Sequence, residues 1–260
     1  MSRITAVVNQ KGGVGKTTTT VNLAHAFAKN GTRRVLAVDL DPQASLSAVL
    51  GMDIGQIEKT IYDLFLEVPL GQSTAQVIHT TSTEGVSLLP STIDLASAEE
   101  LLLTRLSRER VLSLILKPVA FAYDEILIDC PPNLGQLTIN ALTAADEIIV
   151  PFEPDYLGLR ALGHLMRTVD NIKAMTNPNL HMSQLVITKF DKRTRHARII
   201  VDEVRRTFPG KVIEAEVPYS VKAKDAVASG KSIFAYDPDS SVAVAYQGVA
   251  EELENHAEPA

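Results

Sequence analysis

The chain has 260 residues, of which 45% are hydrophobic and 22% charged. This composition is typical of a folded globular protein and excludes a wholly disordered, collagen-like or coiled-coil chain. The longest mostly apolar stretch, Val111 to Tyr123, contains Lys117 and Pro118 and is shorter than the ~18 apolar residues that span a bilayer. The single cysteine, Cys130, excludes an intramolecular disulfide, a cysteine-rich zinc site and an iron–sulfur cluster held by four cysteines of one chain.

The charge is unevenly distributed along the chain. The net charge of −6 argues against a nucleic-acid partner, because binding to phosphates depends largely on Lys and Arg. However, the segment from Lys189 to Lys231 has eleven basic and six acidic residues, which gives it a charge of +5 and leaves −11 on the rest. The N-terminus also lacks the charged and apolar regions of a signal peptide, so we expect a cytoplasmic protein.

Short apolar runs alternate with longer amphipathic segments, which predicts an α/β fold with a mostly parallel twisted β-sheet flanked by helices on both faces. Strands are expected at Ile4–Asn9, Val35–Asp39, Val86–Leu89, Glu125–Asp129, Glu147–Pro151, Leu185–Thr188 and Val212–Val217. Helices are expected at Lys16–Asn30 with Gly31 as the stop signal, Ile93–Leu116, Leu157–Thr176, His196–Phe208 and Ser240–Glu254. The chain shows no repeat and no linker-like stretch, so we expect a single domain over residues 1–260 with a frayed acidic end at 251–260.

A glycine-rich loop joins the first expected strand to the first expected helix. It reads Gln10-Lys11-Gly12-Gly13-Val14-Gly15-Lys16-Thr17-Thr18. Glycines allow backbone N–H groups to surround a polyphosphate, and the helix directs its positive end at the same anion. In this pattern Lys16 reaches the β- and γ-phosphates and the Thr17 hydroxyl binds Mg²⁺. The usual first glycine of the pattern is replaced here by Gln10.

Carboxylates follow two other apolar strands. Asp39 and Asp41 stand at the end of the second expected strand, and Asp129 ends the strand that precedes Cys130. An aspartate in the position of Asp129 holds Mg²⁺ directly or through water in nucleotide-hydrolysing enzymes. We interpret Cys130 as a small buried side chain beside the site, because no activating histidine can be placed near it.

The string Lys-Gly-Gly-Val-Gly-Lys-Thr resembles the deviant Walker A motif of the ParA/MinD superfamily of P-loop ATPases. The resemblance implies an enzyme that hydrolyses ATP with Mg²⁺ and in which Lys11 reaches across an ATP-bridged homodimer to the partner's nucleotide. It implies catalytic roles for Lys11, Lys16 and Asp41, with Asp41 orienting the attacking water. The nucleotide would be held by Lys11, Gly12, Gly13, Val14, Gly15, Lys16, Thr17 and Thr18, and the metal by Thr17, Asp39 and Asp129.

Later segments resemble small Soj-like ParA proteins. These segments are Asp129–Gly135, Pro151–Leu159, Thr188–Thr194, Val217–Ala226, Gly230–Ile233 and Tyr236–Ser240. Family members have Pro-Arg-Asn near the adenine, where this chain reads Pro218-Tyr219-Ser220. The resemblance therefore implies that Pro218 contacts the nucleotide. Ser220 stands where the family has asparagine, and we expect it to contact the nucleotide although it departs from the family pattern.

The resemblance also implies binding of double-stranded DNA without sequence preference when the ATP dimer forms. The basic segment supplies a physical basis, since Lys and Arg on one face of a dimer would contact phosphates. The candidates are Arg193, Arg195, Arg198, Lys222 and Lys224, with Arg205 and Arg206 in the same segment. We therefore expect a nucleoid-associated protein that segregates plasmid or chromosome DNA, with hydrolysis stimulated by a ParB-like partner.

Other functions of the superfamily remain as alternatives. A positioner of a protein cargo, such as a carboxysome or a chemoreceptor cluster, would use the same cycle with a different adaptor. A MinD-like membrane cycle is less expected, because the C-terminal region after Ala250 is acidic rather than basic. The iron–sulfur branches of the superfamily need at least two cysteines per chain, and a binding module without activity would not need Lys11, Asp41 and Asp129 together.

Overall fold

A mostly parallel β-sheet forms the centre of the computed structural model, which describes residues 2–29, 33–68 and 73–256. Within these residues the sheet has seven strands in the order β3-β4-β2-β5-β1-β6-β7. All neighbouring strands are parallel except β3 and β4. The strands are β1 Arg3–Val7, β2 Val35–Asp39, β3 His79–Thr80, β4 Val86–Leu89, β5 Glu125–Asp129, β6 Glu147–Phe152 and β7 His181–Ile187. The predicted fold class is confirmed.

Side chains alternate between two hydrophobic cores, one on each face of the sheet. In β2, Leu36 and Val38 join one core, whereas Val35 and Ala37 join the other. Successive side chains of a strand point to opposite faces, and a strand covered on both faces is therefore apolar almost throughout. This explains why the central strands could be recognised from short apolar runs.

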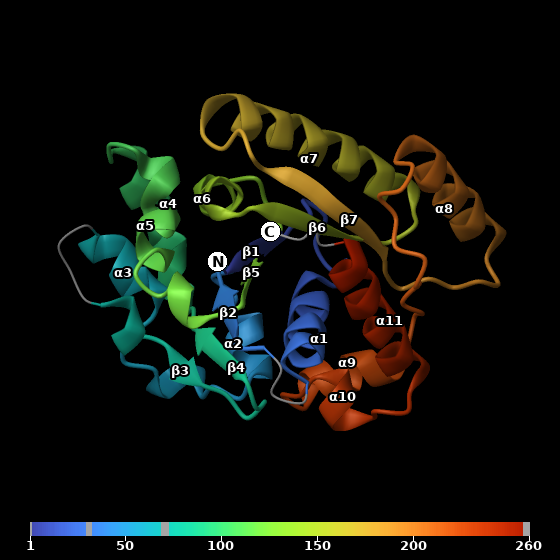
Figure 1. Ribbon diagram of the computed structural model, residues 1–260, viewed down its shortest axis with the longest axis horizontal. Coiled ribbons are helices and arrows are strands. Elements are labelled where there is room, and N and C mark those ends of the chain that lie inside the picture. The colour runs from blue at the N-terminus through green and yellow to red at the C-terminus, as the bar shows by residue number, and fades with distance from the viewer. Residues whose placement is uncertain (1, 30–32, 69–72, 257–260) are drawn as a thin grey trace.

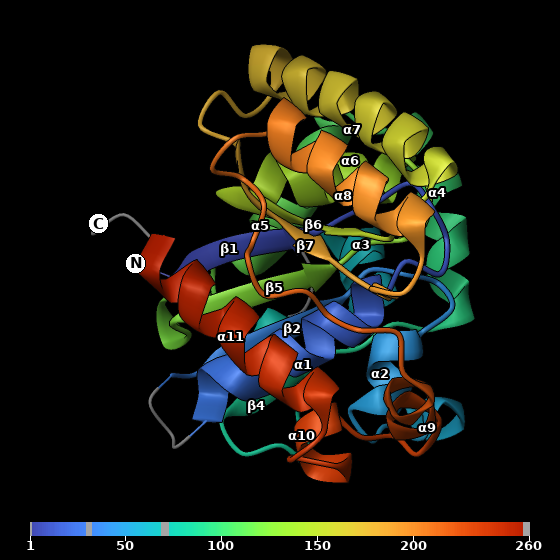
Figure 2. The same cartoon turned by 90° about the vertical axis from the view of Figure 1, so that its right-hand side faces the viewer.

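Two layers of helices cover these faces (Figures 1 and 2). One core includes residues of α3 Ile61–Glu67, α4 Ala96–Leu103, α5 Val111–Leu116, α6 Gln136–Ala144, α7 Tyr156–Met175 and α8 Arg195–Thr207. The other includes residues of α1 Lys16–Ala28, α2 Ser45–Val49, α9 Val221–Ala228, α10 Ile233–Tyr236 and α11 Ser241–His256. None of the helices in the described residues is both long enough and apolar enough to cross a membrane.

The expected continuous helix over Ile93–Leu116 is wrong. The structure has a 3-10 turn at Ile93–Leu95, then α4, a second 3-10 turn at Arg108–Arg110, and α5. The break contains Ser107 in the left-handed conformation, at φ 51°. The break allows α4 and α5 to pack against α6 separately, so the segment forms two short helices in place of one.

The expected strand over Val212–Val217 is also wrong. This segment runs beside β7, with the Ile213 N–H donating to Leu185 O at 2.9 Å, but it forms only isolated bridges. The N–H groups of Glu214 and Ala215 donate instead to the Glu252 carboxylate of α11, at 2.8 and 2.9 Å. A side chain from a distant helix therefore takes the donors that a regular strand would use.

The chain ends depart from expectation in one respect. Residues 251–256 continue α11 rather than fraying, because Leu253 is buried against the sheet at 1% exposure. Residues 257–260 and the expected stop at Gly31 lie outside the described residues.

The structure also has a helix at Gln136–Ala144 that is not among the expected helices, although Leu137, Ala141 and Leu142 show the spacing of a buried helical face.

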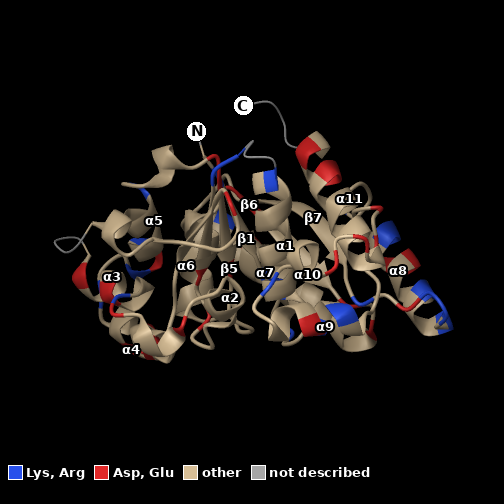
Figure 3. Ribbon diagram, turned by 90° about the horizontal axis from the view of Figure 1, so that it is seen from below, with Lys and Arg blue, Asp and Glu red and all other residues tan. Residues whose placement is uncertain are grey.

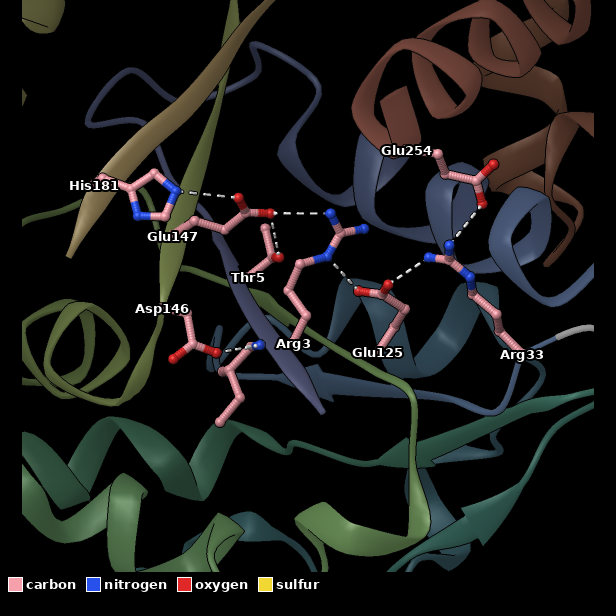
Figure 4. A network of polar contacts seen from close by, with 9 residues as sticks. Arg3, Thr5, Arg33, Glu125, Asp146, Glu147, His181 and Glu254 are labelled. Carbon is pink, nitrogen blue, oxygen red and sulfur yellow. Dashed lines mark hydrogen bonds and ion pairs between the residues drawn. The ribbon is translucent and has the colours of Figure 1, made fainter. Parts of the chain in front are cut away.

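Charged side chains hold the amino ends of the strands together (Figure 4). Arg3 Nε donates to Glu125 Oε2 at 2.9 Å, and Arg33 binds the other oxygen of that carboxylate at 2.6 Å. Arg33 also reaches Glu254 of α11 at 3.4 Å. Burial raises the pKa of Glu125, and the two arginines oppose this effect. The network therefore joins the amino ends of β1 and β5 to α11, at the edge of the sheet opposite the carboxyl ends of the strands.

Candidate active site

The glycine-rich loop lies between β1 and α1, at the carboxyl ends of the strands. Gly13 and Gly15 have φ angles of 75° and 95°, which glycine adopts without strain. Asn9 anchors the start of the loop, since its Oδ1 accepts from the Lys11 N–H at 2.9 Å and its Nδ2 donates to Pro151 O at 2.7 Å. The sequence prediction of a strand, a loop and a helix is confirmed.

A cavity of about 480 Å³ opens above this loop. It is lined by Gly12, Gly13, Val14, Gly15, Lys16, Thr17, Thr18, Asp41, Gln43, Ser45, Pro132, Thr188, Lys189, Val217, Pro218, Tyr219, Ser220, Ala223, Lys224, Val227, Ala228 and Tyr246. The lining combines the polar loop with apolar side chains from the segment Val217–Tyr219 and from α9. A pocket with a polyphosphate cradle and an apolar slot fits a nucleotide.

Lys16 lies at the start of α1 with only 7% of its surface exposed. Burial lowers the pKa of its ammonium group, and the nearby Asp129, Cys130 and Asp41 partly oppose this effect. A polyphosphate would supply the counter-charge that favours the protonated form. The buried ammonium group of Lys16 therefore favours binding of an anionic ligand.

Thr17 and Asp129 meet below the loop, with the Thr17 hydroxyl donating to Asp129 Oδ2 at 2.6 Å. Burial, together with the neighbouring Asp39, raises the pKa of Asp129 to about 8. A hydroxyl and a carboxylate are hard oxygen ligands of the kind that Mg²⁺ prefers beside phosphates, and a divalent cation would favour the ionised carboxylate. The donor set therefore fits magnesium.

Asp39 has a different environment from the one expected for a metal ligand. Its Oδ2 accepts from both the N–H and the hydroxyl of Ser47, at 2.8 and 2.7 Å, and its Oδ1 accepts from the Asp41 N–H at 3.2 Å. Burial raises its pKa to about 6, and the bonds from Ser47 oppose this effect. Asp39 thus fixes the loop that carries Asp41, whose own side chain lines the cavity.

Lys11 is bound within its own chain. Its ammonium group donates to Glu153 Oε2 at 2.8 Å and also to Asp155, both on the loop between β6 and α7. Burial alone would lower its pKa, but the bonds to these two carboxylates outweigh that effect and raise it. The Lys11 backbone therefore belongs to the glycine-rich loop, while its ammonium group contacts the two carboxylates that follow β6.

The cavity is also lined by residues that were not named individually as site residues. Pro218 and Ser220 line it as expected, and Ser220 Oγ also caps α9 by accepting from the Lys222 N–H at 3.2 Å. The additional lining residues Thr188, Lys189 and Tyr246 lie far from the loop in sequence. The first two belong to the segment Thr188–Thr194, which by its resemblance to ParA proteins closes a strand near the nucleotide, whereas no local pattern marked Tyr246.

Cys130 is fully buried, as expected, and burial raises the pKa of its thiol. A thiol that stays protonated is a poor nucleophile. The interpretation of this residue as a packing side chain is confirmed.

The expected DNA-binding residues lie on two separate helices and on the loop before one of them: Arg195 and Arg198 are on α8, Arg193 precedes α8, and Lys222 and Lys224 are on α9. Figure 3 shows basic segments on α8 at one end of the molecule and on α9 nearer its centre. Arg193 forms an ion pair with Asp191 at 2.9 Å, and Lys222 binds Asp237. Lys224 lies 5.0 Å from the centre of the Tyr219 ring, at the rim of the cavity.

Arg195 and Arg198 are exposed on α8. Neither forms an ion pair within the part of the chain that the structure describes. In contrast, Arg205 is paired with Glu214 and Glu216. The basic residues therefore differ in how much of their charge is free for a partner.

Comparison with known proteins places the chain among close relatives. A family model described as an AAA domain matches residues 2–182. The sporulation initiation inhibitor protein Soj of Bacillus subtilis is 40% identical over 253 residues, which cover 97% of this chain and 98% of Soj. The chromosome partitioning protein ParA of Myxococcus xanthus is also 40% identical, over 97% of this chain and 88% of that protein.

Solved structures show the same fold. A Mycobacterium smegmatis protein described as cobyrinic acid a,c-diamide synthase, with bound ADP and magnesium, has a TM-score of 0.85 and 36% identity. The alignment covers 98% of this chain and 95% of that one. The cell division ATPase MinD of Pyrococcus furiosus has a TM-score of 0.80 and 28% identity, with 99% and 100% coverage.

Proposed function

The chain belongs to the family of the Soj and ParA partitioning proteins, and on this premise we propose that it is a single-domain ATPase that binds ATP with Mg²⁺ in the cavity above the loop. One observation carries the proposal. The Thr17 hydroxyl and the buried Asp129 carboxylate meet at 2.6 Å beside the buried ammonium of Lys16. This is the arrangement that a magnesium-bound polyphosphate requires.

Each polar residue of the site has a distinct role in this proposal. Lys16 and the N–H groups of the loop bind the phosphates, and Thr17 and Asp129 hold the metal, which when bound neutralises phosphate charge. Asp41 orients the attacking water from the cavity wall. Asp39 positions Asp41 through its bonds to Ser47 and to the Asp41 N–H.

We further propose that hydrolysis requires a homodimer bridged by ATP. Lys11 would leave Glu153 and Asp155 and place its charge on the partner's nucleotide, where a cation stabilises the transferring phosphoryl group. Exposed apolar side chains next to the site would be covered by the second copy. Tyr156 and Leu157 are 64% and 63% exposed beside Asp155, and Tyr219 is 53% exposed at the cavity rim.

The ATP dimer would bind double-stranded DNA without sequence preference and associate with the nucleoid. Arg195 and Arg198 are the strongest candidates for phosphate contacts, because Arg193 and Lys222 are already paired with carboxylates. The DNA-bound dimer would segregate plasmid or chromosome DNA, and a ParB-like partner would stimulate its slow hydrolysis. The relatives named for chromosome partitioning and Soj support this assignment.

The decisive experiment measures binding to random-sequence duplex DNA with ATP, with ADP and without nucleotide across a salt series. We expect binding only with ATP, weakening steeply as salt rises. The double variant Arg195→Glu/Arg198→Glu should lose DNA but keep ATPase activity, whereas Arg34→Glu, which reverses an exposed charge paired with Asp124, should keep both. Absence of DNA binding in every nucleotide state would refute the DNA-based function and direct attention to a protein scaffold.

The enzymatic part has its own tests. Lys16→Ala should abolish ATP binding, and retained affinity would refute the phosphate assignment. Asp41→Ala should bind ATP and DNA without hydrolysing ATP, and normal turnover would remove Asp41 from its role.

A further inference from the structure

The end of β7 contacts the outer side of the glycine-rich loop. The hydroxyl of Thr188, which is 2% exposed, donates to Val14 O at 2.7 Å. The ammonium group of the next residue, Lys189, donates to Gly13 O. Two successive carbonyls of the loop are therefore bound by the side chains of the two residues that follow β7, about 175 residues later in the chain.

Lys189 adopts an unusual backbone conformation to make this contact. Its φ is 52°, in the left-handed region that disfavours a side chain with a Cβ atom. Such a conformation persists where the surroundings impose it, and such positions cluster at functional sites. Here the neighbouring backbone is fixed on both sides, because the Thr188 N–H donates to Phe152 O at 2.9 Å and the Phe190 N–H donates to Val217 O at 3.0 Å.

The two bonds determine the direction of the loop's own donors. A peptide unit is planar and trans, so its N–H points away from its C=O. Because Gly13 O and Val14 O face the end of β7, the N–H groups of Val14 and Gly15 point away from it. These are two of the donors with which a loop of this type surrounds phosphate oxygens.

We propose that Lys189 is a positioning residue for the nucleotide, which it serves by fixing the Gly13 carbonyl and so orienting the loop's N–H groups. The inference rests on the proposed nucleotide function and deepens it. Lys189 also lines the cavity, as do Val217 and Pro218. Its positive charge adds to that of Lys16 in favouring a polyphosphate.

This role predicts an effect on binding rather than on turnover. The contact lies within the protein and holds the loop equally for ATP and ADP, and such a uniform contribution changes KM without changing kcat. Removal of a hydrogen bond from a charged donor is expected to lower the nucleotide affinity by about tenfold. Lys189→Met should therefore lower the affinity for both MgADP and MgATP by about tenfold and change kcat by less than about twofold.

Calorimetric titration with MgADP and with MgATP tests the inference, with steady-state kinetics alongside. Lys192→Met is the matched control, because Lys192 is an exposed lysine three residues away that pairs with Glu216 and does not line the cavity. It should bind nucleotide like the parent protein. Lys189→Arg, which keeps a cationic donor, should recover part of the affinity.

Lys189→Asn separates positioning from folding. Asparagine tolerates the left-handed conformation but has no ammonium group, so the nucleotide-free melting temperature should not fall while nucleotide affinity should. Affinities of Lys189→Met and Lys189→Asn within about twofold of the parent would overturn the inference and leave the proposed ATPase intact. Absence of nucleotide binding by the parent protein would refute the proposed function, and the inference with it.

Discussion

The ion pairs that hold Lys11 in the single chain should oppose dimerisation. If Lys11 must reach the partner's nucleotide, it has to leave Glu153 and Asp155 first. The Lys11 and Glu153 side chains are 21% and 32% exposed, so this pair is partly screened by solvent and contributes about 0.5–1 kcal/mol. A symmetric dimer breaks two Lys11–Glu153 pairs, one in each copy, and these two pairs together cost about 1–2 kcal/mol, or about 5- to 30-fold in the dimer Kd.

Glu153→Gln should therefore tighten the ATP-dependent dimer by about 5- to 30-fold. Asp155→Asn should act in the same direction. It removes the charge but keeps the helix cap, since Asp155 Oδ1 accepts from the Gly158 N–H at 2.7 Å and asparagine caps helices as well as aspartate does.

Sedimentation equilibrium with Mg²⁺ and a non-hydrolysable ATP analogue measures this constant. Glu251→Gln is the control, because it removes one exposed carboxylate near the end of α11 at the opposite pole of the sheet (Figure 2). The advantage of Glu153→Gln should shrink as salt rises and screens the pair. An unchanged or weaker dimer for Glu153→Gln at low salt would refute the reasoning.

Three further predictions concern stability. Gly158→Ala should lower the free energy of unfolding in urea by about 1–3 kcal/mol, because the added Cβ would lie 2.7 Å from Glu153 O. An unchanged or higher urea midpoint, which is expected for Gly→Ala at a helix position with free space, would contradict this prediction. Asn140→Ala should cost about 2–4 kcal/mol, since Asn140 accepts from the Leu112 N–H at 3.0 Å and donates to Arg108 O, before α5, and to Gln136 O, at the start of α6. A loss below about 1 kcal/mol in the same assay would show that water replaces these bonds. Burial lowers the pKa of His25 below 6.5, so the unfolded chain binds the proton more readily, and stability present above pH 6.5 is lost as the pH falls through that value. His25→Gln should thus show a smaller drop in melting temperature than the parent between about pH 7.5 and 5.5, and equal drops would exclude His25 as a contributor.

Several features of the protein were determined by local sequence. The loop from Gln10 to Thr18 combines glycines, Lys16 and Thr17 within nine residues, and the preceding strand and following helix have clear periodic patterns. Asp129 could be placed because strands buried on both faces are apolar and a carboxylate at their end stands out. For these features the chemical signal lies within a few neighbouring residues, and the parallel sheet brings the strand ends to one edge.

Other features depend on contacts between distant segments. The strand expected at Val212–Val217 fails because Glu252 takes its backbone donors, and Asp39 turns out to bind Ser47. Lys11 meets Glu153, which is 142 residues later, and Lys189 meets Gly13 across 176 residues. Both contacts exist because β6 pairs with β1 and β7 pairs with β6, so the loops after these three strands lie side by side. The order of strands in a sheet is decided by how all the helices pack on its two faces, and no local pattern in the chain encodes it.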